Sequence, residues 1–192
     1  MKLCLERGAD VNLVDEEKQT ALTHAMTSGS VDVVELLLEH GADPNFRCAG
    51  GISPLFHAIL IAERSARLIE ILLEHKADVL ALCSEDATIL GFSSRMDSTS
   101  FNILIDHMVK EGQHKNLDAR GDSALHLVCQ TADRCIRTLL DNGLGPNLRN
   151  TSVETPLHVA TKSGRVNTVR ILLDRGADVS ARTEEDGLMP PL

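Results

Sequence analysis

Cysteine is the residue type of this chain best suited to nucleophilic, redox or metal chemistry. The five cysteines form an odd, scattered set: Cys4, Cys48, Cys83, Cys129 and Cys135. This pattern predicts reduced thiols in the cytoplasm or nucleus rather than a disulfide framework. Cys129 and Cys135 stand six residues apart, which leaves a redox or metal role open, but two small buried hydrophobic side chains explain the pair better.

Other catalytic signatures are absent from the sequence. It contains no Cys-x-x-Cys or His-Glu-x-x-His spacing for zinc, no Gly-x-Ser-x-Gly nucleophile elbow and no Gly-x-x-x-x-Gly-Lys phosphate loop. His126 and His158 each stand fourth in a short Ser/Thr-x-Leu-His segment. There the imidazole can bond within the turn and bridge to the next segment, so we expect no catalytic residue, no cofactor and no metal.

Charge and composition exclude further classes of function. The net charge is −9, from 28 acidic and 19 basic residues, and Trp and Tyr are absent. A nucleic-acid binder normally carries a basic surface and aromatic stacking platforms, and an anionic membrane also attracts basic patches. The longest nearly apolar run, residues 55–62, is too short to span a bilayer, and the first residues lack a signal peptide's apolar stretch. We therefore expect no nucleic acid and no membrane as partners.

Internal repeats are the strongest signal, and they define the elements that would hold any site. A Gly-Ala-Asp marker stands at Gly8–Asp10, Gly41–Asp43 and Gly176–Asp178, with weaker copies at Lys76–Asp78 and Gly143–Gly145. A second marker begins at Thr20, Ser53, Thr88, Ser123 and Thr155, in steps of 32 to 35 residues. Two independent markers with a period near 33 predict a repeat architecture.

The last full repeat shows how each unit folds. Thr155 can cap a short inner helix, and Pro156 takes the first helical position, where its missing N–H does no harm. A second helix follows at residues 169–173, and Gly176 ends it in the left-handed conformation. The first full repeat has the same order, in which Thr20 caps, Gly29 breaks, residues 33–38 form the second helix and Gly41 ends it.

These segments, Thr155–His158 and Val169–Val179 on a 33-residue period, resemble the ankyrin repeat. The resemblance covers essentially the whole chain and implies an all-α solenoid of stacked helix-turn-helix units joined by hairpin-like loops. We expect a single array over 1–192: a partial repeat at 1–19, repeats at about 20–52, 53–87, 88–122 (degenerate), 123–154 and 155–187, and the start of another at 188–192. Both ends match incomplete repeats, so we expect a fragment of a longer array.

The middle repeat departs from the pattern. Gly91 falls within its expected inner helix, where glycine costs about 1 kcal/mol relative to alanine. Lys76 replaces the glycine that should end the preceding second helix. We therefore expect residues 84–116 to be the weakest layer and to divide the array into two folding units.

The family resemblance implies that partners bind the concave face, which inner-helix ends and loop tips line. The residues predicted to bind are Glu16, Glu17, Thr27, Ser28, Phe46, Arg47, Arg120, Asp122, Asn150, Lys162 and Ser163. Phe46 and Arg47 are the expected anchor, because aromatic residues and arginine dominate binding hot spots. Alternatively, Phe46 folds back onto the loop at residues 49–51. The resemblance also leaves open hydroxylation of Asn12, Asn45 and Asn147, but a turn-stabilising role is favoured.

The sequence thus predicts a non-enzymatic protein-binding module, monomeric or part of a longer chain, in the cytoplasm or nucleus. One alternative is a recognition or sensor arm of a larger protein, such as a ubiquitin-ligase adaptor or a signalling receptor. A second is an enzyme with an unrecognised Cys/His site, which one abnormally reactive cysteine would reveal.

Overall fold

The computed structural model describes residues 9–48, 50–61, 65–80, 88–113 and 122–183. The chain divides into two compact units: Met1–Ile89 with Arg95–Ile103, and Leu90–Ser94 with Leu104–Leu192. Within the described ranges the regular elements are helices, and the β-structure is one isolated bridge between Val14 and Thr20. This confirms the predicted all-α class. None of the helices in these ranges has the length and apolarity needed to cross a membrane.

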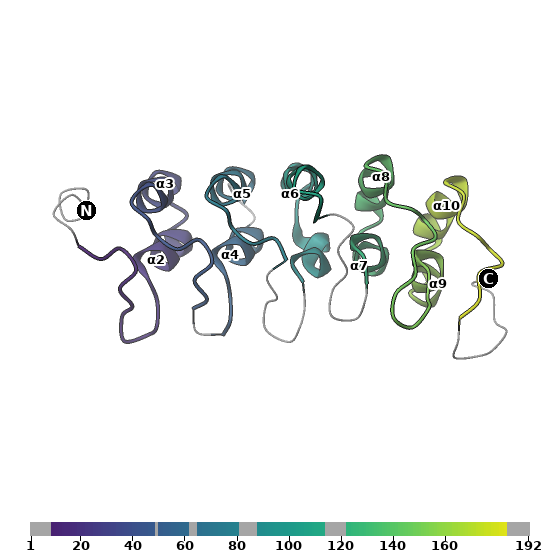
Figure 1. Cartoon of the computed structure of the whole chain (residues 1–192), viewed down its shortest axis with the longest axis horizontal. Coiled ribbons are helices and arrows are strands. Elements are labelled where there is room, and N and C mark those ends of the chain that lie inside the picture. Colours follow the sequence, from purple (N-terminus) through teal and green to yellow (C-terminus); the bar gives the residue numbers. More distant parts are fainter. Residues whose placement is uncertain (1–8, 49, 62–64, 81–87, 114–121, 184–192) are drawn as a thin grey trace. The chain divides into compact units, whose positions relative to one another are not determined.

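The first unit contains two helix pairs. They are α2 (Ala21–Ser28) with α3 (Val31–Glu39), and α4 (Pro54–Leu60) with α5 (Ser65–Glu74). The inner helices α2 and α4 lie side by side in one layer, and the outer helices α3 and α5 form a second layer against them (Figure 1). The loop between the pairs extends on the side of the inner helices (Figure 1).

Local sequence sets the ends of these helices as predicted. The hydroxyl of Thr20 accepts a hydrogen bond from the backbone N–H of Thr23, and the Thr23 hydroxyl oxygen accepts one from the N–H of Thr20. Gly29 follows α2 with φ of 66°, and Gly41 follows α3 with φ of 87°. Lys76 takes the same left-handed conformation after α5, with φ of 66°. A side chain with a Cβ pays roughly 1–2 kcal/mol for this conformation, so Lys76 is a strained substitute for glycine.

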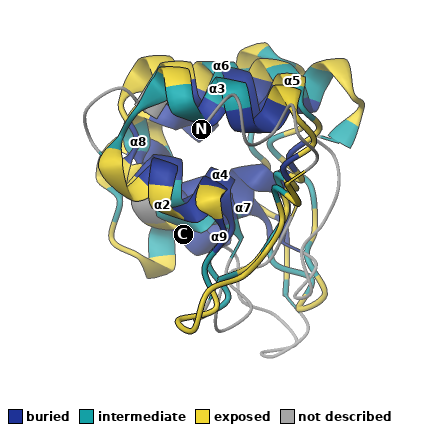
Figure 2. Cartoon of the chain, turned by 90° about the vertical axis from the view of Figure 1, so that its left-hand side faces the viewer, coloured by how far each residue is buried: buried dark blue, intermediate teal, exposed yellow. Residues whose placement is uncertain are grey.

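Aliphatic side chains fill the space between the two layers. Leu22 and Met26 of α2, Val34 and Leu37 of α3 and Leu55 of α4 are all at most 1% exposed. Figure 2 shows dark blue buried stretches on the helices, next to teal and yellow stretches on the same helices and on the loops. Because aromatic residues are scarce, each layer is only as thick as interlocking leucine, isoleucine and valine side chains allow.

The middle repeat lacks the inner α-helix that the sequence analysis expected. A 3-10 helix, η2 (Ile89–Arg95), stands in its place and contains Gly91. Thr88 does not cap it in the expected way, because its Oγ1 atom is buried without a hydrogen-bond partner. The predicted second helix is confirmed as α6 (Ser98–Lys110). The boundary between the two units runs through both elements.

The second unit contains two further helix pairs. They are α7 (Ala124–Thr131) with α8 (Asp133–Asp141), and α9 (Pro156–Lys162) with α10 (Val166–Asp174). The inner helices α7 and α9 pack on each other, and the outer helices α8 and α10 do the same. Pro156 occupies the first turn of α9, and Gly176, with φ of 84°, follows α10, both as predicted.

Candidate binding surface

The loop before α2 forms a tight hairpin around Asp15. The Asp15 N–H donates to the Gln19 carbonyl at 2.9 Å, and one carboxylate oxygen of Asp15 accepts the N–H groups of Glu17 and Gln19, each at 2.9 Å. An aspartate that binds the backbone two residues ahead in this way fixes a turn. Glu16 and Glu17, two predicted binding residues, are exposed at its tip.

A side-chain contact fastens this tip to the inner helix. The second carboxylate oxygen of Asp15 lies 2.7 Å from Nε2 of His24 on α2. This bond, together with the backbone donors, lowers the pKa of Asp15 below its usual value. This contact links the hairpin tip to α2.

Phe46 and Arg47 lie in the corresponding loop before α4. Phe46 is half-buried and Arg47 is exposed, and the loop closes where the N–H of Cys48 donates to the carbonyl of Ile52 at 3.2 Å. The alternative contact of Phe46 with residues 49–51 includes residue 49, which lies outside the described residues.

The predicted binding residues at the inner-helix ends are exposed in both units. On α2 the Thr27 hydroxyl donates to the Thr23 carbonyl at 3.0 Å, and the Ser28 hydroxyl donates to the Ala25 carbonyl at 2.9 Å. Lys162 at the end of α9 and Ser163 after it are also exposed. The hydroxyls of Thr27 and Ser28 keep acceptor capacity for a partner.

The hairpin before α9 is built around Asn150 in the way that the first is built around Asp15. The Asn150 side-chain oxygen accepts the N–H groups of Ser152 and Glu154, and its amide donates to Asp122 at 2.8 Å. Lys162 donates to Glu154 and so fastens this hairpin to α9. Burial opposes ionisation of Glu154, but the bonds from Lys162 and Asn150 outweigh it and lower the pKa.

The structure thus joins two predicted binding residues, Asp122 and Asn150, to each other. Asp122 is only 6% exposed, and the Asn150 amide occupies one of its oxygens. Its position favours a role in holding the hairpin over a contact with a partner. Arg120 lies outside the described residues.

Three loop asparagines each connect one repeat to the following one. Asn45 donates to the carbonyl of Lys76 at 3.2 Å, and its side-chain oxygen accepts the N–H of Asp78 at 2.7 Å. Asn12 makes the same pair of bonds with Gly41 and Asp43, and Asn147 makes it with Gly176 and Asp178. We refer to these three pairs of hydrogen bonds as the asparagine clamps, and they give the three side chains a structural role that links one repeat to the next.

The buried thiols and imidazoles are poorly suited to catalysis. Burial raises the pKa values of Cys129 and Cys135, so both thiols stay protonated and weakly nucleophilic. Burial likewise lowers the pKa of His126, whose Nε2 lies 3.1 Å from the carbonyl of Glu154 and whose Nδ1 accepts the Ser123 N–H at 3.2 Å. Within the described ranges no group of three or more His, Cys, Asp or Glu residues is placed to hold a metal ion.

Sequence reasoning missed the exposed apolar residues next to the first tip. Leu13 is 68% exposed and Val14 is 52% exposed, immediately before Asp15. Leu13 has the same place after Asn12 that Phe46 has after Asn45, so alignment of the repeats could have found it.

A family model described as "Ankyrin repeats (3 copies)" matches residues 1–83 and 93–183. Among curated relatives, human "Ankyrin repeat and MYND domain-containing protein 1" is 34% identical over 93% of this chain and 20% of its own length. The "E3 ubiquitin-protein ligase KEG" of Arabidopsis thaliana is 27% identical over 96% of this chain and 12% of its own length. The chain therefore spans a small part of either relative.

The fold is also similar to that of a solved structure, the ankyrin repeat domain of Bcl-3. The TM-score is 0.80 at 23% identity, over 98% of this chain and 83% of that one. At this identity the similarity concerns the fold.

Proposed function

Because the chain belongs to the ankyrin-repeat family, we propose that it is a protein-recognition module that binds a partner through its hairpin tips and inner-helix ends and has no catalytic activity of its own. Ankyrin repeats generally mediate protein–protein interaction. The observation that carries the proposal is the fastening of the exposed first tip, in which Asp15 binds both its own turn and His24. A tip that is already held in place loses little conformational entropy when a partner binds.

In the first unit, the proposed contacts differ in chemistry. Phe46 and Arg47 supply an aromatic ring and a guanidinium group, the two side-chain types that most often dominate binding energy. Glu16 and Glu17 add negative charge at the neighbouring tip, and Leu13 and Val14 add exposed apolar surface beside it. This combination suits a partner that presents an apolar patch bordered by basic groups.

In the second unit, the proposed contacts are Lys162 and Ser163, with Asn150 as a secondary contact. Asn150 is half-buried, and its side chain already binds Asp122 and the turn. The odd number and wide spacing of the cysteines support a cytoplasmic or nuclear location.

A second candidate function is a recognition arm within a larger protein. The relative named as an E3 ubiquitin-protein ligase supports it, since this chain corresponds to 12% of that protein. Flanking sequence that encodes a catalytic or membrane domain would favour this candidate, and the binding surface proposed above would then select the substrate or signal.

The test is affinity capture from a cell lysate with the 192-residue chain as bait. The Phe46→Ala/Arg47→Ala variant is compared with a matched control, Val166→Ala/Arg182→Ala, which also removes one exposed apolar group and one exposed arginine. We expect a partner that the unchanged chain and the control capture and that the Phe46/Arg47 variant loses, with helical circular dichroism preserved. Equal capture by all three proteins would exclude Phe46 and Arg47 as the anchor.

A further inference from the structure

Two aspartates of α8, one at each end of the helix, bind polar or basic side chains in or next to α10. At one end, Asp133 of α8 accepts the Thr168 hydroxyl at 2.6 Å and lies 3.9 Å from the guanidinium of Arg165. At the other end, Asp141 accepts from Arg175 at 2.7 Å. Both acids of α8 are thus already paired with the region of α10.

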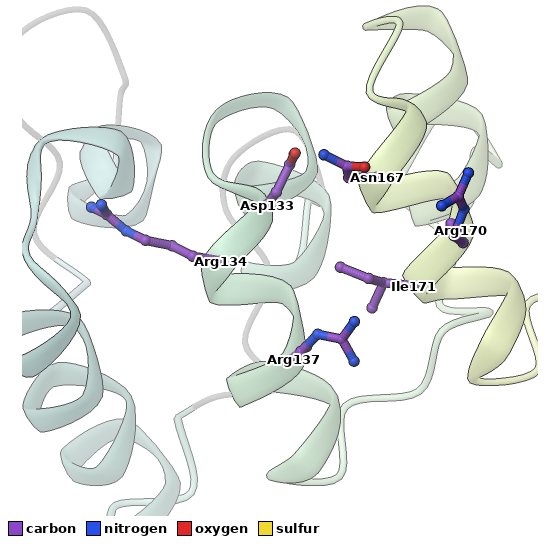
Figure 3. Close-up of a pocket in the computed structure, with 6 residues that line it drawn as sticks. All are labelled: Asp133, Arg134, Arg137, Asn167, Arg170 and Ile171. Atoms are coloured by element: carbon purple, nitrogen blue, oxygen red, sulfur yellow. The ribbon is translucent and has the colours of Figure 1, made fainter.

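A hollow of about 340 Å³ opens between these two ends. Its lining residues are Asp133, Arg134, Arg137, Asn167, Arg170 and Ile171. Figure 3 shows Ile171 projecting from α10 toward α8, Arg137 reaching across from α8 and Arg170 on the α10 side, whereas Arg134 points away. The guanidinium of Arg134 donates to the carbonyl of Ser93 at 3.4 Å, which directs it away from α10.

Arg137 and Arg170 have no acidic partner in the described part of the chain. Both side chains are exposed, and neither makes a hydrogen bond or an ion pair with a described residue. The acid nearest to them along the lining, Asp133, is already engaged by Thr168 and Arg165. The hollow is therefore lined by two guanidinium groups that form no ion pair with a described residue, in a chain whose net charge is −9.

The first unit shows the opposite charge at the same place in the repeat. Glu35 and Glu70 lie at the same distance in sequence from the end of their outer helix as Arg137 and Arg170 do from the end of theirs. In that unit Arg67 joins both acids, at 3.2 Å to Glu35 and 3.3 Å to Glu70. The acids at this place in the first unit thus share one arginine as ion-pair partner, whereas Arg137 and Arg170 have no ion-pair partner among the described residues.

We propose that the hollow between α8 and α10 is a second docking site, which binds an acidic segment of a partner protein through the carboxylates of its Asp or Glu residues. Charge complementarity identifies the occupant. A guanidinium group presents its donors as a planar fork that matches a carboxylate, and two such groups on facing helices can hold two carboxylates of one extended segment. Asn167 adds an exposed amide at the rim.

The floor of the hollow suits the remainder of such a segment. Ile171, which is 8% exposed, is the apolar residue among those that line the hollow. Contact with this side chain removes water around the ion pairs, and ion pairs are worth more when they are shielded from water. The site is chemically distinct from the hairpin tips, where the acidic pair Glu16 and Glu17 favours basic groups.

The test measures fluorescence anisotropy of a labelled peptide of alternating glutamate and alanine, titrated with the 192-residue chain. The peptide with glutamine in place of glutamate is the ligand control. Arg137→Glu/Arg170→Glu gives the second unit the residues found at this position in the first. Arg95→Glu/Arg182→Glu changes the net charge equally at exposed sites outside the hollow, and circular dichroism checks that each variant is folded.

We expect the reversal at Arg137 and Arg170 to weaken glutamate-peptide binding about tenfold or more, since it replaces attraction by repulsion at both anchors. The Arg95/Arg182 variant and the Phe46→Ala/Arg47→Ala variant should bind the peptide nearly as well as the unchanged chain, and the glutamine peptide should bind poorly. Equal weakening by both charge reversals would overturn the proposal in favour of general electrostatic attraction. Binding of a phosphoserine peptide but not of the glutamate peptide would overturn the assignment of a carboxylate occupant.

Discussion

The hydrogen bonds of the buried imidazoles of His126 and His158 require the neutral form of each ring. In each, Nδ1 accepts a backbone N–H, from Ser123 in one case and Thr155 in the other, each at 3.2 Å. A nitrogen that accepts a hydrogen bond carries no proton of its own, so these contacts need the neutral ring. Burial disfavours the charged ring as well and lowers the pKa of both residues.

These shifts predict that acid weakens the fold. Each lowered pKa means that the unfolded chain binds the proton more tightly than the folded chain does. The contribution of these two histidines to the free energy of unfolding is therefore fully present above the ordinary histidine pKa of 6.5, and it declines as the pH falls below that value. Burial also lowers the pKa of His57, so acid should reduce the free energy of unfolding through this residue as well. Urea unfolding at about pH 7.5 and about pH 5.5 should give a lower midpoint at the acidic pH.

The matched variant for this prediction is His126→Gln/His158→Gln. It should be less stable than the unchanged chain near neutrality, because the ring contacts are lost, and its midpoint should depend less on pH. If the double variant keeps the full pH dependence, other groups are responsible for it.

At the level of elements, the asparagine clamps explain how successive loops keep their positions. Each clamp ties the loop that precedes an inner helix to the end of the next outer helix, as Asn45 does with Lys76 and Asp78. Leu80 has the corresponding place in the next repeat, where its side chain can neither donate nor accept a hydrogen bond. The clamp is therefore missing from the sequence at the repeat that precedes the 3-10 helix η2.

Replacing one clamp tests its contribution. Asn45→Leu copies the natural residue at position 80 and removes two hydrogen bonds, so we expect a loss of about 1–3 kcal/mol in the free energy of unfolding. Asn45→Asp keeps the acceptor for the Asp78 N–H and loses only the donor to Lys76, so its loss should be smaller. Urea denaturation followed by circular dichroism measures both, and equal stability of all three proteins would show that the clamp contributes little.

For the whole molecule, the division into two compact units suggests that each can open by itself. The division falls where the regular pattern is weakest, at the 3-10 helix that contains Gly91. In a repeat protein, stability is roughly a sum over neighbouring layers, so a weak layer limits how far a local change is felt. We therefore predict that a core mutation in one unit leaves the other closed.

Cysteine labelling can test this independence. Leu157, in α9 of the second unit, and Leu22, in α2 of the first, are at most 1% exposed, and truncation of either to alanine should cost about 2–5 kcal/mol. Cys129 of α7 is buried in the second unit, so its thiol reacts only when that unit opens. Leu157→Ala should accelerate labelling of Cys129, measured by peptide mapping, and Leu22→Ala should not. The same acceleration in both variants would show that the chain opens as one cooperative body.

The sequence by itself determined the repeat, the helix ends and the class of the fold. These features depend on local rules, since Thr20 and Thr155 can cap and Gly41 and Gly176 can turn left-handed wherever they stand in the chain. The role of His126 as a bridge was predicted for the same reason. The missing inner α-helix at Gly91 was not predicted, because a single glycine costs too little to decide between an α-helix and a 3-10 helix without its surroundings.

Only the tertiary structure decided how the polar side chains are used. Asp122 was expected to meet a partner, but its carboxylate binds Asn150, 28 residues away. Arg137 and Arg170 have no ion pair among the described residues, because Asp133 and Asp141 of α8 pair with other groups. The spacing of residues in the sequence indicates which of them can lie near each other. Which side chains pair depends on the distances between separate helices, and the packing of the buried side chains sets those distances.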